Sequence, residues 1–262
     1  MPTPEADGRV RGKVALISGG ARGQGASHGR VLAAHGAKVV LGDILDDEGE
    51  RTAADLRGDG LDVRYVHLDV TKPGDWDAAV RFTESACGRL NVVVNNAGIV
   101  GTGTVLDCTL EEWEAVTAVN QTGVFLGIQR TAPAVERAGG GSIINISSVA
   151  GTLGTEFESI AYHASKAAVH LLTRCAAVTL APRIRVNTIT PGITATGMAD
   201  TIGEARLAAR LAAYPMGRAA RPDEVSHAVL FLASDESSFT TGAELRVDGG
   251  ALAGIRGRRE KA

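Results

Sequence analysis

Two side chains near the middle of the chain have the types and the spacing of an acid/base pair. Tyr162 and Lys166 lie four residues apart at the start of a long apolar, Ala-rich run that predicts a helix. This step places both on one helical face, where the ammonium charge lowers the cost of ionising a hydroxyl whose unperturbed pKa is about 10. The pair predicts proton transfer. A surface tyrosine beside a solvated lysine is the alternative that the motif alone leaves open.

A glycine-rich turn near the N-terminus has the layout of a phosphate-binding site. The apolar run 13–18 predicts a strand buried on both faces, and 26–35 predicts the helix after it. The spacing of the turn is G-x-x-x-G-x-G rather than G-x-G-x-x-G. Its glycines let the backbone approach a pyrophosphate, which the helix start attracts; a simple strand-to-helix turn is the alternative. The expected cofactor contacts here are Gly19, Arg22, Gly23, Gln24 and Gly25.

An acidic residue follows the second predicted strand, 38–42. Asp43 comes about 20 residues after the glycine turn, where a carboxylate hydrogen-bonds the ribose hydroxyls of an adenosine and repels a 2'-phosphate. The position favours NAD over NADP as the cofactor. Arg22 argues mildly for NADP, because a guanidinium pairs with phosphate, but Asp43 would face that phosphate directly and carries more weight.

The remaining pattern predicts one α/β domain. Helical segments separate further strands predicted at 63–68, 90–94, 142–148, 185–189 and 242–247. Such alternation implies right-handed βαβ units, and hence a Rossmann-type, doubly wound parallel sheet of about seven strands with helices on both faces. We assign 13–252 to this catalytic domain and 193–214 to a substrate loop, with a pair of short surface helices as the alternative. Flanking it are a polar, flexible tail, 1–12, and a basic tail, 253–262.

Polar and small residues follow several of these strands and are expected to meet at one edge of the sheet. Asp69 and Val70 follow the third strand, although capping of the next turn is an equal alternative for the aspartate. After the fourth strand, side-chain amides and Gly98 can form a cofactor floor. Ser148 ends the fifth strand, with a turn-forming serine as the alternative. The cofactor contacts expected at this edge are Asp69, Val70, Asn96, Ala97 and Gly98.

A helix is predicted over 110–137, with polar and flexible residues in its middle. Asn120 and Gly123 are unfavourable in a helix interior. They indicate a local distortion or a site that holds water. Helix packing is the alternative explanation for Gly123.

Composition excludes several other classes of function. The 27 basic and 30 acidic residues give a formal charge of -3, so we expect no general attraction to nucleic acid or anionic membranes. No apolar stretch approaches the roughly 20 residues of a membrane helix. Cys87, Cys108 and Cys175 have neither a disulfide framework nor zinc-ligand spacing. We therefore expect a cytoplasmic protein whose chemistry needs no metal.

In this order and on these elements, the motifs resemble the short-chain dehydrogenase/reductase family over about residues 10–251. The resemblance implies that Tyr162 is the acid/base and that Lys166 lowers its pKa and holds the nicotinamide ribose. It also implies that Ser148 orients the substrate carbonyl and that Asn120 positions a water in a proton relay. The residues that resemble the segment holding the nicotinamide carboxamide are Pro191, Gly192, Thr194 and Thr196.

More narrowly, three segments resemble bacterial 3α(20β)-hydroxysteroid dehydrogenases, which implies an NADH-using homotetramer; they are 42–49, 139–151 and 241–250. The chain departs from the family or from that enzyme at three places. Gln24 replaces a usually apolar residue, the segment 148–162 is one residue longer, and 197–214 matches poorly. These differences concern the substrate rather than the chemistry.

We expect an NAD-dependent enzyme that interconverts a secondary alcohol and a ketone on a hydrophobic small molecule such as a steroid or terpenoid. The segment 193–214 shows no obvious basic cluster, which disfavours the nearest rival, a reductase of 3-oxoacyl groups on a carrier protein. A non-catalytic, NAD-sensing binding protein is the alternative from another class. The presence of Asn120, Ser148, Tyr162 and Lys166 argues against it.

Overall fold

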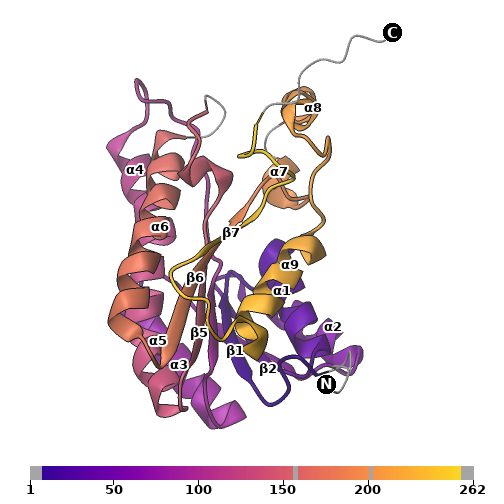
Figure 1. Cartoon of the computed structure of the whole chain (residues 1–262), viewed down its shortest axis with the longest axis vertical. Coiled ribbons are helices and arrows are strands. Elements are labelled where there is room, and N and C mark those ends of the chain that lie inside the picture. Colours follow the sequence, from indigo (N-terminus) through magenta and orange to yellow (C-terminus); the bar gives the residue numbers. More distant parts are fainter. Residues whose placement is uncertain (1–7, 156–158, 201–202, 255–262) are drawn as a thin grey trace.

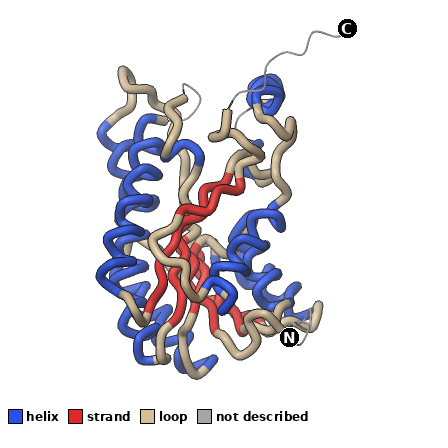
Figure 2. Tube along the Cα trace, in the orientation of Figure 1, coloured by secondary structure: helices blue, strands red, loops and turns tan. Residues whose placement is uncertain are grey.

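A parallel sheet runs through the centre of the computed structural model, which describes residues 8–155, 159–200 and 203–254 (Figures 1 and 2). Its seven strands lie in the order β3-β2-β1-β4-β5-β6-β7, and every neighbouring pair is parallel. The strands are β1 (Val14–Ser18), β2 (Lys38–Asp43), β3 (Val63–His67), β4 (Val92–Asn95), β5 (Gly141–Ile146), β6 (Ile184–Pro191) and β7 (Glu244–Val247). The predicted doubly wound fold is confirmed. The strand order reverses between β1 and β4, where ligands bind in such sheets.

Helices cover both faces of the sheet (Figure 1). One layer holds α1 (Gly23–Ala34), α2 (Asp46–Gly58) and α9 (Pro222–Ala233). The opposite layer holds α3 (Pro73–Cys87), α4 (Leu110–Thr117), α5 (Gly123–Arg137) and α6 (Ile160–Leu180).

The central strands are apolar throughout because alternate side chains enter two separate cores. In β1, Ala15 and Ile17 pack in the core beneath α1 and α9, whereas Val14 and Leu16 pack in the core beneath α3 and α5. This two-sided burial accounts for a continuous apolar run in place of the alternation seen in half-exposed strands. Packing on both faces also fixes the position of the carboxyl end of β1.

The predicted distortion in the middle of 110–137 is confirmed. A π-helical turn, η1 (Ala118–Thr122), joins α4 to α5 and contains Asn120. Gly123 follows it, and a Cβ there would lie only 2.9 Å from Cγ2 of Val70. The glycine therefore permits close packing, while the π turn sets the direction of the asparagine.

The segment expected to be a substrate loop forms two short helices, α7 (Gly197–Asp200) and α8 (Glu204–Ala213). They lie at the upper end of the sheet in Figure 1. A parallel bridge between Thr194 and Ala220 ties the start of this segment to the chain that leads into α9. The alternative of two short helices is thus the correct description of the backbone.

The start of the domain lies earlier than predicted. Val10 is 1% exposed, and its backbone N–H donates to the carbonyl of His35. Residues 8–12 therefore pack with the domain, which corrects that part of the predicted tail, 1–12. Residues 253 and 254, at the start of the predicted basic tail, are exposed. Residues 1–7 and 255–262, which hold most of the two predicted tails, lie outside the described residues.

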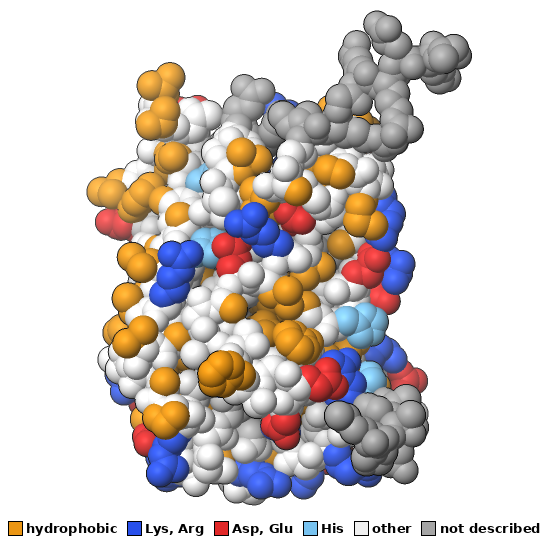
Figure 3. Space-filling view, viewed as in Figure 1, with side chains coloured by type: hydrophobic (Ala, Val, Ile, Leu, Met, Phe, Trp, Pro, Cys, Tyr) orange, Lys and Arg blue, Asp and Glu red, His pale blue; other side chains and the backbone are white. Residues whose placement is uncertain are grey.

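Within the described ranges, no helix is both long and apolar enough to cross a membrane. Lys and Arg side chains are interspersed with Asp and Glu over the face seen in Figure 3.

Candidate active site

Tyr162 and Lys166 lie in the first two turns of α6, which begins after the Ser159 cap. Both side chains are buried, with 8% and 4% exposure, and the lysine Nζ lies 5.7 Å from the centre of the tyrosine ring. Nζ donates a 3.0 Å hydrogen bond to the carbonyl of Ile146, the last residue of β5. Burial lowers the pKa of Lys166 to about 8. A charge so placed favours the ionised form of a neighbouring phenol.

Asn120 is fixed beside α6 by three hydrogen bonds. Its Nδ2 donates to the carbonyl of Ile99 and to Oγ of Ser165, at 2.9 and 3.1 Å, and its Oδ1 accepts from the N–H of Ile99 at 2.9 Å. A Cβ on Gly98 would lie 3.3 Å from Nζ of Lys166 and 3.4 Å from Oδ1 of Asn120. The predicted asparagine, lysine and glycine are therefore brought together around one point.

Ser148 stands after β5, at the start of the short 3-10 helix η2 (Val149–Gly151). Its Oγ accepts a 3.2 Å hydrogen bond from the N–H of Ala150. The hydroxyl retains its own proton for donation to a ligand oxygen. The alternative of a turn-forming serine therefore holds without excluding a role of Ser148 in the site.

A cavity of about 380 Å³ opens beside these groups. Ser148 and Tyr162 line this cavity. So do the four residues expected near the nicotinamide carboxamide, which are Pro191, Gly192, Thr194 and Thr196. Its lining consists of Gln24, Val100, Gly101, Thr102, Ser147, Ser148, Val149, Tyr162, Pro191, Gly192, Ile193, Thr194, Thr196, Met198, Ala199, Arg206 and Arg210. The volume is in the range of small-molecule sites, roughly 300–1,000 Å³.

The glycine turn fits a dinucleotide pyrophosphate. Gly19 and Gly23 have φ of 66° and 57°, which glycine adopts without strain. The N-cap residue of α1, Arg22, makes no side-chain cap, so the first-turn N–H groups have no such partner. Gly23 also faces the segment that lines the cavity, because a Cβ there would lie 3.6 Å from Cγ2 of Thr196. A nicotinamide dinucleotide bound on this turn would extend into the cavity.

The turn after β4 supports the glycine turn. Asn96 donates its side-chain N–H groups to the carbonyls of Ser18 and Gly19, each at 3.0 Å. The backbone N–H of Ala97 donates to Oγ of Ser18. A Cβ on Gly19 would meet Cα of Ala97 at 2.8 Å. The two predicted cofactor turns therefore form one rigid unit.

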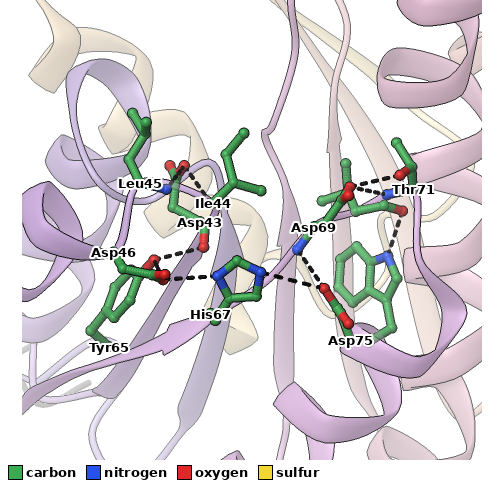
Figure 4. Close-up of polar contacts among 11 residues, drawn as sticks. Asp43, Ile44, Leu45, Asp46, Tyr65, His67, Asp69, Thr71 and Asp75 are labelled. Atoms are coloured by element: carbon green, nitrogen blue, oxygen red, sulfur yellow. Dashed lines mark hydrogen bonds and ion pairs between the residues drawn. The ribbon is translucent and has the colours of Figure 1, made fainter.

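Asp43 joins the glycine turn to the chain before α2, and Figure 4 shows its carboxylate beside Ile44 and Leu45. Its Oδ2 accepts from the N–H of Ala21 at 3.0 Å, and Oδ1 accepts from Ile44 and Leu45 at 2.8 and 3.2 Å. These bonds fix the carboxylate at the end of β2, and the contact with an adenosine ribose stays a prediction.

Asp69 is turned into its own loop. Its carboxylate accepts from the N–H and the hydroxyl of Thr71 at 2.9 and 2.7 Å, and Figure 4 shows it capping this turn. The carbonyl of Val70 accepts from Nε1 of Trp76 at 3.0 Å. Neither residue lines the cavity. The capping alternative describes Asp69 in this structure, and a contact with cofactor stays a prediction for both residues.

A histidine between these loops was not anticipated. His67 bonds to Asp46 at 2.8 Å through Nδ1, and its Nε2 lies 3.6 Å from Asp75 (Figure 4). The hydrogen bond with Asp46 raises the pKa of His67. The bridge links the starts of α2 and α3.

Three further residues near the cavity were also missed. Glu112 accepts from Oγ of Ser159 at 2.7 Å and from the N–H of Gly103 at 2.9 Å, bonds that lower its pKa to about 2. It thereby ties the wall at 101–103 to the start of α6. Arg206 and Arg210 line the cavity from α8, which corrects the expectation that 193–214 holds no basic cluster. Their four-residue spacing is visible in the sequence, although the direction in which α8 faces is not.

Comparisons with known proteins show which sequences and structures this chain is similar to. A family model described as enoyl-(acyl carrier protein) reductase matches residues 19–251. A 3-alpha-(or 20-beta)-hydroxysteroid dehydrogenase of Mycobacterium tuberculosis is 53% identical over 95% of this chain and 92% of its own. A trans-4-hydroxycyclohexanecarboxylate dehydrogenase of Sinomonas cyclohexanicum is 48% identical over 96% and 97%. The crystal structure of gox2181 superposes with a TM-score of 0.90, at 34% identity over 94% and 97%.

Gly25 provides a test of the glycine turn. A Cβ there would lie 2.0 Å from the carbonyl oxygen of Gly19, so Gly25→Ala must displace the turn. We expect NADH affinity, measured by fluorescence titration, to fall at least about tenfold, which is ~1.4 kcal/mol. Gly74→Ala is the matched control, because nothing lies within 4 Å of a Cβ at that position. Unchanged affinity in the Gly25 variant would refute the assignment.

Proposed function

The chain belongs to the short-chain dehydrogenase/reductase family, and on that premise we propose that this secondary-alcohol dehydrogenase and ketone reductase uses NAD(H). One observation carries the catalytic assignment. The hydroxyl-bearing residues Ser148 and Tyr162 line a single cavity, and the buried ammonium of Lys166 lies beside the tyrosine ring. The arrangement combines a proton acceptor, a charge that promotes its ionisation and a hydrogen-bond donor for a substrate oxygen.

In the oxidation direction, the Tyr162 phenolate takes the hydroxyl proton of the alcohol as its carbinol carbon loses hydride. A nicotinamide dinucleotide held by the glycine turn and the segment that begins at Pro191 would supply the hydride acceptor. Ser148 donates a hydrogen bond to the reacting oxygen and positions it. Lys166 stabilises the phenolate before the transfer, and Asn120 links the segment at Ile99 to Ser165 on the same helix as Lys166. In reduction, Tyr162 returns the proton to the oxygen of the ketone.

A ring-containing alcohol is the substrate class that the relatives support. They include dehydrogenases named for a steroid and for a hydroxycyclohexane acid. The cavity offers a ring apolar contacts with Val100, Val149, Ile193 and Met198. These relatives give no support to the rival activities, carrier-bound 3-oxoacyl reduction and non-catalytic NAD sensing, over alcohol oxidation.

The preference for NAD rests on Asp43. Its carboxylate is fixed by the three backbone N–H groups described above, and its charge disfavours a 2'-phosphate. Arg22, the residue that argued for NADP, lies 3.6 Å from the carboxylate of Glu48. This neighbour competes with a phosphate for the guanidinium.

We also propose a homotetramer in a reducing cytoplasm. Large apolar side chains are exposed on three helices of one layer, as expected where subunits meet. They include Trp113, Phe125, Leu171 and Val178, at 39%, 45%, 62% and 83% exposure. All three cysteines are free thiols, which is typical of a reducing compartment.

Tyr162→Phe tests the catalytic assignment. We expect turnover of a cyclic secondary alcohol, followed through NADH absorbance, to fall at least about 100-fold because the proton acceptor is lost. NADH affinity should stay near the wild-type value, since the variant keeps the ring that Lys166 faces. Retained turnover would contradict the proposed role.

Asp43→Ala tests the cofactor. We expect its ratio of kcat/KM for NAD over NADP to fall at least about tenfold relative to the wild type, as the repulsion of the 2'-phosphate disappears. Wild-type protein that already uses both cofactors with similar efficiency would overturn the NAD assignment.

A further inference from the structure

We propose that Arg206 and Arg210 form a carboxylate-binding subsite, so that the preferred substrates are ring alcohols bearing a carboxylate away from the reacting hydroxyl. The proposal rests on the proposed alcohol dehydrogenase function and narrows its substrate class. Both arginines lie on α8 and line the cavity that holds Ser148 and Tyr162. A small molecule in this cavity can therefore contact the catalytic hydroxyls and an arginine together.

The charges in the lining are of one sign. Among the described residues that form it, Arg206 and Arg210 are charged and none is acidic. Side chains four residues apart on a helix are neighbours. A carboxylate that enters the cavity therefore meets positive charge and no acidic side chain among these described residues.

The two arginines differ in exposure. Arg210 is 8% exposed, so its guanidinium is held in place by the surrounding protein. Arg206 is exposed, and it makes no hydrogen bond or ion pair within the described part of the chain. One guanidinium is thus preorganised, while the other is available to close on a ligand. Planar guanidinium groups match the two oxygens of a carboxylate.

The other lining residues match the hydroxyl group and the ring of such a substrate. Hydroxyl groups of Ser148 and Tyr162 stand at the reacting end, and apolar side chains of Val100, Val149 and Met198 belong to the same lining. A saturated ring can span from one to the other. The resulting ligand has a secondary hydroxyl, an apolar ring and a carboxylate.

A matched pair of substrates tests the proposal. We compare kcat/KM for 4-hydroxycyclohexanecarboxylate with that for its neutral isostere, 4-hydroxycyclohexanecarboxamide. In the wild type we expect the acid to be preferred at least about tenfold. Arg206→Gln should abolish this preference by raising KM for the acid, while kcat/KM for the amide is retained. Arg206→Lys should restore part of it.

Arg81→Gln is the charge-matched control, because Arg81 is exposed on α3 and outside the lining. It should leave the preference unchanged. An equal kcat/KM for acid and amide in the wild type, or a preference that survives in Arg206→Gln, would overturn the subsite. So would turnover of uncharged cyclic alcohols combined with rejection of the acid. Absence of turnover with every alcohol would instead refute the proposed function.

The cofactor pyrophosphate is a second possible source of an anion. NADH affinity of Arg206→Gln, measured by fluorescence titration, distinguishes the two. Affinity within about twofold of the wild type supports the substrate carboxylate. A tenfold weaker affinity, with acid and amide affected alike, would assign the arginines to the cofactor and overturn the proposal.

Discussion

A positive charge held inside the protein is the constraint on which the site depends. The ammonium of Lys166 is almost completely buried and donates to the carbonyl of Ile146. Removing it from water disfavours the charged form and brings its pKa down to about 8. The charge is useful only where the chain places a phenol beside it, and α6 does so by setting Tyr162 one turn earlier. Gly98 leaves the space that this arrangement needs.

The sheet topology supplies the other parts of the site. β1 and β4 end side by side, so the glycine turn and the Asn96 turn bond to each other and form one support. The Ile146 carbonyl and Ser148 lie at the carboxyl end of β5, at this same edge of the sheet. The segment that begins at Pro191 follows β6 at that edge. Residues from distant parts of the sequence therefore meet because parallel strands end together. Glu112 accepts hydrogen bonds from Gly103 and from Ser159, and so links the segment 101–103 to the start of α6.

Local patterns were sufficient for the fold and for the residues that the structure brings together around Lys166. Apolar runs and turn glycines predicted the strands of the sheet. Unfavourable residues in a helix predicted a distortion near Asn120, which the structure shows to be a π turn. Side-chain direction was not predictable. The carboxylate of Asp69 bonds within its own loop, although its place at a strand end resembles that of Asp43. Arg206 and Arg210 passed unnoticed because only the packing of α8 against the cavity gives them a common target.

The most direct test follows the ionisation of Tyr162 itself. The ultraviolet absorbance of tyrosinate is titrated with pH in wild-type protein and in Tyr162→Phe, and their difference isolates this residue from Tyr65 and Tyr214. The same difference is then measured in the Lys166→Met background. If the buried ammonium promotes phenolate formation, Tyr162 ionises at lower pH in the presence of Lys166 than in the presence of methionine. The same ionisation midpoint in both backgrounds would contradict the account.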